Sequence, residues 1–169
     1  MPFPNDFLQM LTVMVKHQAE FIVIGGVCGV LHGSTLATKD LDIVHHRTEE
    51  NLSRLLTALQ ELHAYYRGRG GQRLAPRKEW LAADGPNLLR TRLGDLELGT
   101  VSPSRGYDEL LPHTELFPIT EEVKVPILDL PTLIQVKQEA GRDKDKLAVI
   151  MLKATLAEKQ KRQLRSPSE

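Results

Sequence analysis

The chain has 169 residues, 41% of them hydrophobic and 26% charged, a composition typical of one globular domain with its own core. Its formal net charge is zero, so binding to nucleic acid or to acidic membranes would require a local patch. Short, glycine-broken apolar runs argue against a membrane span, and the N-terminus lacks the pattern of a secretory signal. The single cysteine, Cys28, excludes an internal disulfide and favours a reducing, cytoplasmic compartment.

Helical and strand periodicities alternate along the chain and predict an α/β (α+β) fold, with a small mixed sheet and flanking helices. In the first half we expect a helix from Asn5 or Asp6 to Gln18, a strand over Phe21–Ile24, a short helix over Val27–His32, a strand over Leu41–Val44, a helix capped by Thr48, and a loop over Tyr65–Lys78. In the second half we expect strands over Asn87–Arg92 and Asp95–Val101, a helical turn over Tyr107–Leu111, extended segments over Glu115–Ile119 and Val123–Leu128, and helices over Leu130–Ala140 and from Asp143. Residues 1–158 then form a single domain, and the charged segment 159–169 is expected to be a flexible tail.

A glycine pair, Gly25 and Gly26, separates the strand over 21–24 from the short helix that follows. Glycine lets the backbone lie against a phosphate, and the free N–H groups at the start of a helix favour anions. The simpler alternative is that the turn needs glycine only for its geometry. Nearby, we interpret Cys28 as a small core residue and His32 as a packed, hydrogen-bonded residue.

Asp40 and Asp42 lie on the next strand, and residues two apart on a strand share one face. Neighbouring carboxylates repel each other unless a cation neutralises them, and Mg²⁺ or Mn²⁺ prefers oxygen ligands. The pair alone could be a solvated strand end. After the glycine pair it predicts a metal site beside a phosphate cradle, as phosphoryl or nucleotidyl transfer requires. We interpret His45-His46, which follow, as the exposed end of that strand, because no further ligands have metal-site spacing.

Such a site usually has a third carboxylate on a neighbouring strand. The strand that begins near Gly94 offers Asp95 and Glu97, which share one face. We choose Glu97 because it lies deeper in the strand. Asp95 and a plain surface acid remain the alternatives.

These motifs together resemble the nucleotidyltransferase superfamily that includes DNA polymerase beta, whose pattern is a glycine turn, a short helix, Asp-x-Asp and a later strand acid. The chain is most similar to the small bacterial branch that contains the abortive-infection toxin and minimal nucleotidyltransferases. The similarity to that branch includes His32-Gly33, Thr38 and the run Leu130–Leu147, and it extends from Phe21 to about Ile150. It implies a polymerase-beta-type nucleotidyltransferase fold. Two positions depart from the pattern, since many relatives have serine at Gly26 and aspartate at Glu97.

The resemblance also implies roles for individual residues. Gly25 and Gly26 would hold a nucleoside triphosphate by their backbone N–H groups. Asp40, Asp42 and Glu97 would bind the metal ions, and Glu97 would help to deprotonate the acceptor hydroxyl. Candidates for charge on the β- and γ-phosphates are Lys137 and Lys144.

A cluster of basic residues follows Tyr65 and Tyr66 in the predicted loop. It could grip the phosphates of an RNA acceptor, or it could be a solvated, flexible segment. The cluster consists of Arg67, Arg69, Arg73, Arg77 and Lys78.

The resemblance predicts a Mg²⁺-dependent enzyme that moves a nucleoside monophosphate from an NTP to a hydroxyl of RNA, particularly tRNA, or of a protein. It also suggests a toxin–antitoxin role with a cognate antitoxin protein as partner. A second hypothesis, favoured by Gly26 and Glu97, is a non-catalytic nucleotide-binding or partner-binding module on the same fold. A third, transfer to an aminoglycoside-type small molecule, would need an acidic acceptor pocket, for which the sequence offers no strong cluster.

Overall fold

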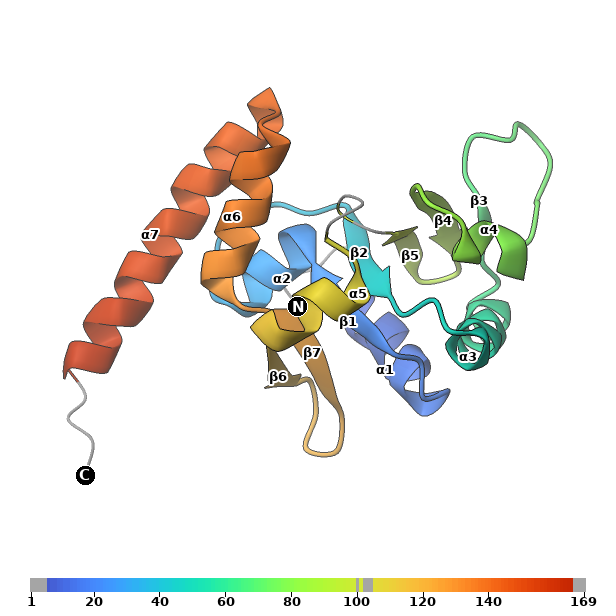
Figure 1. Cartoon of the computed structure of the whole chain (residues 1–169), viewed down its shortest axis with the longest axis horizontal. Coiled ribbons are helices and arrows are strands. Elements are labelled where there is room, and N and C mark those ends of the chain that lie inside the picture. The colour runs from blue at the N-terminus through green and yellow to red at the C-terminus, as the bar shows by residue number, and fades with distance from the viewer. Residues whose placement is uncertain (1–5, 100, 102–104, 166–169) are drawn as a thin grey trace.

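The computed structural model describes residues 6–99, 101 and 105–165, and its centre is a seven-stranded mixed sheet (Figure 1). The strands are β1 (Phe21–Ile24), β2 (Asp40–His45), β3 (Tyr65–Tyr66), β4 (Asn87–Thr91), β5 (Gly94–Gly99), β6 (Thr114–Pro118) and β7 (Lys124–Leu128). Their order in the sheet is β3-β4-β5-β2-β1-β7-β6. The pairs β2–β5 and β1–β7 are parallel, and the other neighbours are antiparallel. The expected α/β class is confirmed.

The helices connect these strands and cover the sheet. They are α1 (Phe7–Lys16), α2 (Gly25–Leu31), α3 (Glu49–Glu61), α4 (Lys78–Ala82), α5 (Tyr107–Leu110), α6 (Leu130–Ala140) and α7 (Asp143–Arg165), with a 3₁₀ turn η1 (Leu111–His113) after α5. Figure 1 shows α7 beside α6 at one side of the molecule, with α3 and α4 at the opposite side. Within the described residues, the helices are too short or too polar to cross a membrane.

Alternation along the central strands separates a core face from a polar face. Leu41 and Ile43 of β2, with Leu96 and Leu98 of β5, are buried in the same apolar cluster as α1. The side chains between them, including both aspartates of β2, therefore point to the other side of the sheet. A one-residue change of register would bury the acids and expose the leucines, so the core fixes where the acids lie.

Local signals at helix ends match the structure. The Asp6 side chain accepts a hydrogen bond from the Gln9 N–H at the start of α1, and Thr48 accepts one from the Asn51 N–H at the start of α3. At the end of α6, Gly141 adopts a left-handed conformation with φ of 63°, which allows the sharp turn into α7. The caps at Asp6 and Thr48 depend on neighbouring residues only, which is why the sequence predicted them.

Buried His32 ties α7 to the sheet. The ammonium group of Lys159 donates to His32 Nδ1 at 2.6 Å, so the ring proton is on Nε2, which donates to the Leu128 carbonyl at 2.8 Å. His32 is therefore packed and hydrogen-bonded, as expected. Residues 159–165 continue helix α7, where the sequence suggested a flexible tail; the last four residues of that segment lie outside the described residues.

Three other expectations differ from the structure. The segment predicted as a loop over 65–78 contains strand β3 and the first residue of α4. Helix α2 begins at Gly25, two residues before the predicted start. His45 is not exposed: it is 2% accessible, and its Nε2 bonds to the Leu81 carbonyl at 2.7 Å. Part of the strand predicted to reach Val101 lies outside the described residues.

Candidate active site

Three carboxylates converge on the polar face of the sheet. Asp40 and Asp42 come from β2, Glu97 comes from β5, and each offers an oxygen within 4.8 Å of the others. The parallel register explains the convergence, because it places Asp42 directly beside Glu97 and Asp40 beside Asp95. All three acids are partly buried, so their charges are only partly screened by water. We call these three residues the acid trio.

The acid trio is electrostatically costly without a cation. Burial, followed by the adjacent Glu97 carboxylate, raises the pKa of Asp42 from 3.8 to about 7. Asp42 Oδ1 is buried and has no hydrogen-bond partner among the described residues. A buried carboxylate oxygen without a partner, within reach of two further carboxylates, is a donor set suited to a hard divalent cation. The residues present therefore fit the metal that the sequence predicted.

Gly25 lies directly against this cluster. Its φ is +70°, and a side chain there would collide with the Asp42 carboxylate. Only glycine combines that backbone conformation with this close approach. Its neighbour Gly26 has an ordinary φ, but a Cβ there would lie 2.8 Å from the Cβ and Oγ1 of Thr38. Close packing therefore accounts for both glycines, and it brings the backbone of the turn to the acid trio.

Of the two lysines proposed for the phosphates, Lys137 is the one whose charge acts on the acid trio. Its positive charge acts to lower the pKa of Asp42, although less strongly than burial and Glu97 raise it. The Lys137 ammonium lies 3.4 Å from Asp145, which is 2% accessible and is also held by Arg142 at 2.7 Å. Lys144 is exposed and forms no ion pair among the described residues, so its role rests on the sequence resemblance alone.

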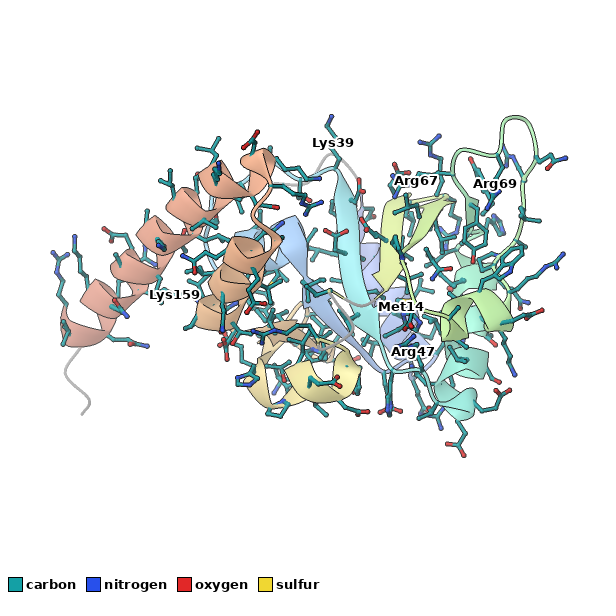
Figure 2. All side chains as sticks on the ribbon, turned by 45° about the horizontal axis from the view of Figure 1, so that its top comes forward. Met14, Lys39, Arg47, Arg67, Arg69 and Lys159 are labelled. Carbon is teal, nitrogen blue, oxygen red and sulfur yellow. The ribbon has the colours of Figure 1, made fainter. Side chains whose placement is uncertain are left out.

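Asp95, the alternative third acid, is neutralised by arginines. Arg90 Nε donates to Asp95 Oδ1 at 3.0 Å, and Arg67 Nη1 lies 3.5 Å from Asp95 Oδ2. The other terminal nitrogen of Arg67 lies 3.4 Å from Asp40 Oδ2, so one guanidinium group bridges the two aspartates. Figure 2 shows Arg67 beside β4 and Arg69 in the loop that follows β3. Asp95 therefore has two arginine partners, whereas in the acid trio only Asp40 contacts an arginine, and Asp42 and Glu97 form no ion pair among the described residues.

The predicted basic cluster is divided between several places. Arg67 reaches the acids, and Arg69 is exposed. Arg73 stacks over Tyr65 with its guanidinium carbon 4.9 Å from the ring centre, and Arg77 lies over Trp80 at 4.8 Å. Lys78 pairs with Glu49 at 2.8 Å. The structure thus joins one member of the cluster to the acid trio and orders two others on aromatic rings.

Some features of the site region were not visible in sequence reasoning. Trp80 was not singled out, although it packs edge-to-face on Tyr66 with ring centres 5.3 Å apart. His46 stacks on Tyr107, with ring centres 4.4 Å apart.

Cys28 is buried, and burial raises the pKa of its thiol, which agrees with a core residue and not with a nucleophile.

Comparison with solved structures supports the fold. The chain superimposes with a TM-score of 0.57 on a crystal structure from Thermotoga maritima, of a protein provisionally assigned as a nucleotidyltransferase. The match covers 92% of this chain and 96% of the other, with 16% sequence identity. At this identity the likeness establishes a nucleotidyltransferase-like fold and leaves activity to be argued from the site. No protein-family model matches the chain, and neither does the sequence of any curated protein.

Proposed function

We propose that the protein is a metal-dependent nucleotidyltransferase that moves a nucleoside monophosphate from an NTP to an acceptor hydroxyl group. The acceptor is an RNA, such as tRNA, or a protein. The observation that carries this proposal is the acid trio, with Gly25 packed against it on a nucleotidyltransferase-like fold. Asp40, Asp42 and Glu97 would hold Mg²⁺ or Mn²⁺. When bound, the metal supplies positive charge that offsets the charge developing on the phosphates and on the acceptor oxygen.

Residues on one side of Asp42 would bind the triphosphate, and Glu97 on the other side would face the acceptor. The backbone of Gly25 and Gly26 would lie against the triphosphate, and Lys137 would offset the negative charge of the departing phosphates. On the β5 side, the Glu97 carboxylate would accept the proton of the acceptor hydroxyl. The acceptor oxygen forms a bond to the α-phosphorus as the bond to the α–β bridging oxygen breaks. Pyrophosphate leaves with that electron pair, so atoms and charge balance.

A transfer assay tests this proposal. Purified protein is mixed with each radiolabelled NTP, Mg²⁺ and either total RNA or cell lysate, beside the Asp40→Asn/Asp42→Asn double variant. Asp143→Asn serves as the control, because that side chain is 99% exposed and lies on α7. We expect label on RNA or on a protein band, lost in the double variant and retained in the control. Nucleotide binding without transfer under any NTP would instead identify a non-catalytic binding module.

The toxin–antitoxin role is a further part of the proposal, and it rests on the sequence resemblance. If the acceptor is an RNA needed for growth, such as tRNA, expression of the active protein should arrest growth and the double variant should not. A cognate antitoxin would be a protein that restores growth and abolishes transfer when it is added to the assay.

A further inference from the structure

A cavity of about 440 Å³ lies at the β3–β4 edge of the sheet, between the loop after β3, helix α4 and the start of β4. This volume is in the range of small-ligand pockets, about 300–1,000 Å³. We call it the β4 cavity. The residues of its lining that matter here are Tyr66, Arg67, Arg69, Trp80, Asn87 and Leu88.

The sheet register connects the β4 cavity to the acids. Leu88, in the cavity lining, is the direct cross-strand neighbour of Glu97. Side chains of directly paired residues lie on the same face, about 4.5–5.5 Å apart at Cβ. Arg67 forms a second connection, because it lines the cavity and also reaches Asp40 and Asp95. Tyr66 pairs with Leu89 and lies on the core face with Trp80 packed on it, so an extended molecule in the cavity would reach Glu97 by passing around the edge of β4.

The position of Gly25 assigns the two sides of the site. Gly25 follows β1 directly and lies against Asp42, and β1 and β5 flank β2 on opposite sides. If the triphosphate lies along the glycine turn, the acceptor hydroxyl approaches from the Glu97 side. The rest of the acceptor molecule then lies over β4 and passes around its edge to the cavity.

The chemistry of the cavity suits single-stranded nucleic acid better than a polypeptide. Two arginines, Arg67 and Arg69, line the cavity, in a chain whose net charge is zero. Trp80 and the Arg77 guanidinium above it are both groups on which bases stack. The one acid in the lining, Asp84, is paired with Arg47 at 2.9 Å. Cations that contact phosphates beside a stacking platform are the combination that binds single strands with little dependence on sequence.

We propose that the β4 cavity receives a base of a single-stranded RNA, with Trp80 as stacking platform and Arg69 as phosphate contact, and so places a ribose hydroxyl of that RNA at Glu97. This inference rests on the proposed function and specifies its acceptor. Arg67 would contact the phosphate between the cavity and the acids.

The chain has one tryptophan, so its fluorescence reports on this cavity alone. We would titrate the 169-residue chain, in EDTA, with a short single-stranded RNA and with a duplex of the same sequence. A base stacked on Trp80 should quench the fluorescence for the single strand and not for the duplex. Free NTP at equal concentration should quench much less.

Two variants and one control test the assignment of residues by fluorescence anisotropy of labelled RNA. Trp80→Leu should weaken binding roughly tenfold, because it removes a stacking surface. Arg69→Gln should weaken binding and reduce the slope of log affinity against log salt by about 0.7, the effect of one phosphate contact on a single strand. Arg69 is exposed and outside the core, so its variant should fold normally. Arg162→Gln, an exposed arginine on α7, should change neither quantity.

The outcomes separate this inference from the proposed function. Acid-dependent labelling of a protein, with no RNA binding, would overturn the RNA acceptor and leave the transferase intact. RNA binding that does not quench Trp80, or that is unchanged in Arg69→Gln, would show that RNA binds outside the β4 cavity. If free NTP quenched Trp80 as strongly as RNA does, the cavity would be the site of the NTP substrate and not of the acceptor. Quenching by RNA with the expected variant effects, but no transfer under any NTP, would support the RNA site and refute the transferase.

Discussion

Replacing Asp42 with asparagine should stabilise the metal-free protein while abolishing transfer. Burial and the Glu97 carboxylate raise the pKa of Asp42 to about 7, against 3.8 for an ordinary aspartate. This difference of roughly three pH units corresponds to about 4 kcal/mol of extra cost for ionising Asp42 in the folded state. Because Asp42 is only partly buried, water screens part of this cost. We therefore expect Asp42→Asn to be more stable than the wild type by about half of it, ~2 kcal/mol.

The sign of the effect sets its pH dependence. A carboxyl group whose pKa is higher in the folded than in the unfolded state costs nothing below pH 3.8. The cost grows as pH rises from that value to about 7 and is constant above it. The increase in the free energy of unfolding of Asp42→Asn should therefore reach its full value at about pH 8 and be about a quarter of that value at about pH 4.5.

The assay is thermal and urea denaturation in EDTA at both pH values. For a chain of this size, ~2 kcal/mol corresponds to a rise in Tm of about 4–8 °C. Asp143→Asn, whose side chain is 99% exposed, should leave Tm unchanged. Millimolar Mg²⁺ should raise the Tm of the wild type more than that of Asp42→Asn, because a bound cation removes the same repulsion. An Asp42→Asn variant no more stable than wild type at about pH 8 would refute the argument that the acid trio is strained without a cation.

Three further predictions concern neighbouring groups. Gly26→Ala should destabilise the protein by about 1–3 kcal/mol, because a Cβ at that position would lie 2.8 Å from the Thr38 side chain and overpack the turn. A thermal melt measures this loss. The control Gly71→Ala has open space around it and should leave the stability almost unchanged. Lys137→Met should slow transfer by about 10²-fold with the substrate concentrations saturating, and an unchanged rate would remove Lys137 from the phosphate site. Burial lowers the pKa of His32 and of His45, so their contribution to stability is complete above pH 6.5 and is lost as pH falls below it. Urea denaturation of an Asp42→Asn background between about pH 7 and 5 should show this loss, and no decline in that window would contradict it.

The acid trio shows how far sequence reasoning reaches. Asp40 and Asp42 were predictable because their shared face depends only on the two-residue period of one strand. The choice between Asp95 and Glu97 depends on the register between β2 and β5, whose paired residues are 55 positions apart in sequence and share no turn. Sequence alone could say only that Asp95 and Glu97 share a face; the register adds that Glu97 lies beside Asp42 and Asp95 beside Asp40.

The segment after α3 shows where sequence reasoning failed. Glycines and arginines dominate 65–78, and local propensity therefore predicted a loop. Strand β3 exists because Tyr65 and Tyr66 pair with Arg90 and Leu89 of β4, a tertiary contact with no local signal. The same pairing positions Arg67, the next residue, where it reaches the acids. The prediction of an acceptor surface came from the composition, but its location could come only from the sheet.

Gly26 had suggested a non-catalytic module, because many relatives have serine there. The structure shows that the space of a side chain at Gly26 is filled by Thr38, whose Oγ1 would lie 2.8 Å from a Cβ at that position. The Thr38 hydroxyl donates to the Asp40 carbonyl at 3.0 Å, which links it to the strand that carries the acids. A hydroxyl group is therefore present beside the glycine turn, supplied by another residue. The absence of serine at Gly26 thus follows from how Thr38 packs, and it is not by itself an argument against catalysis.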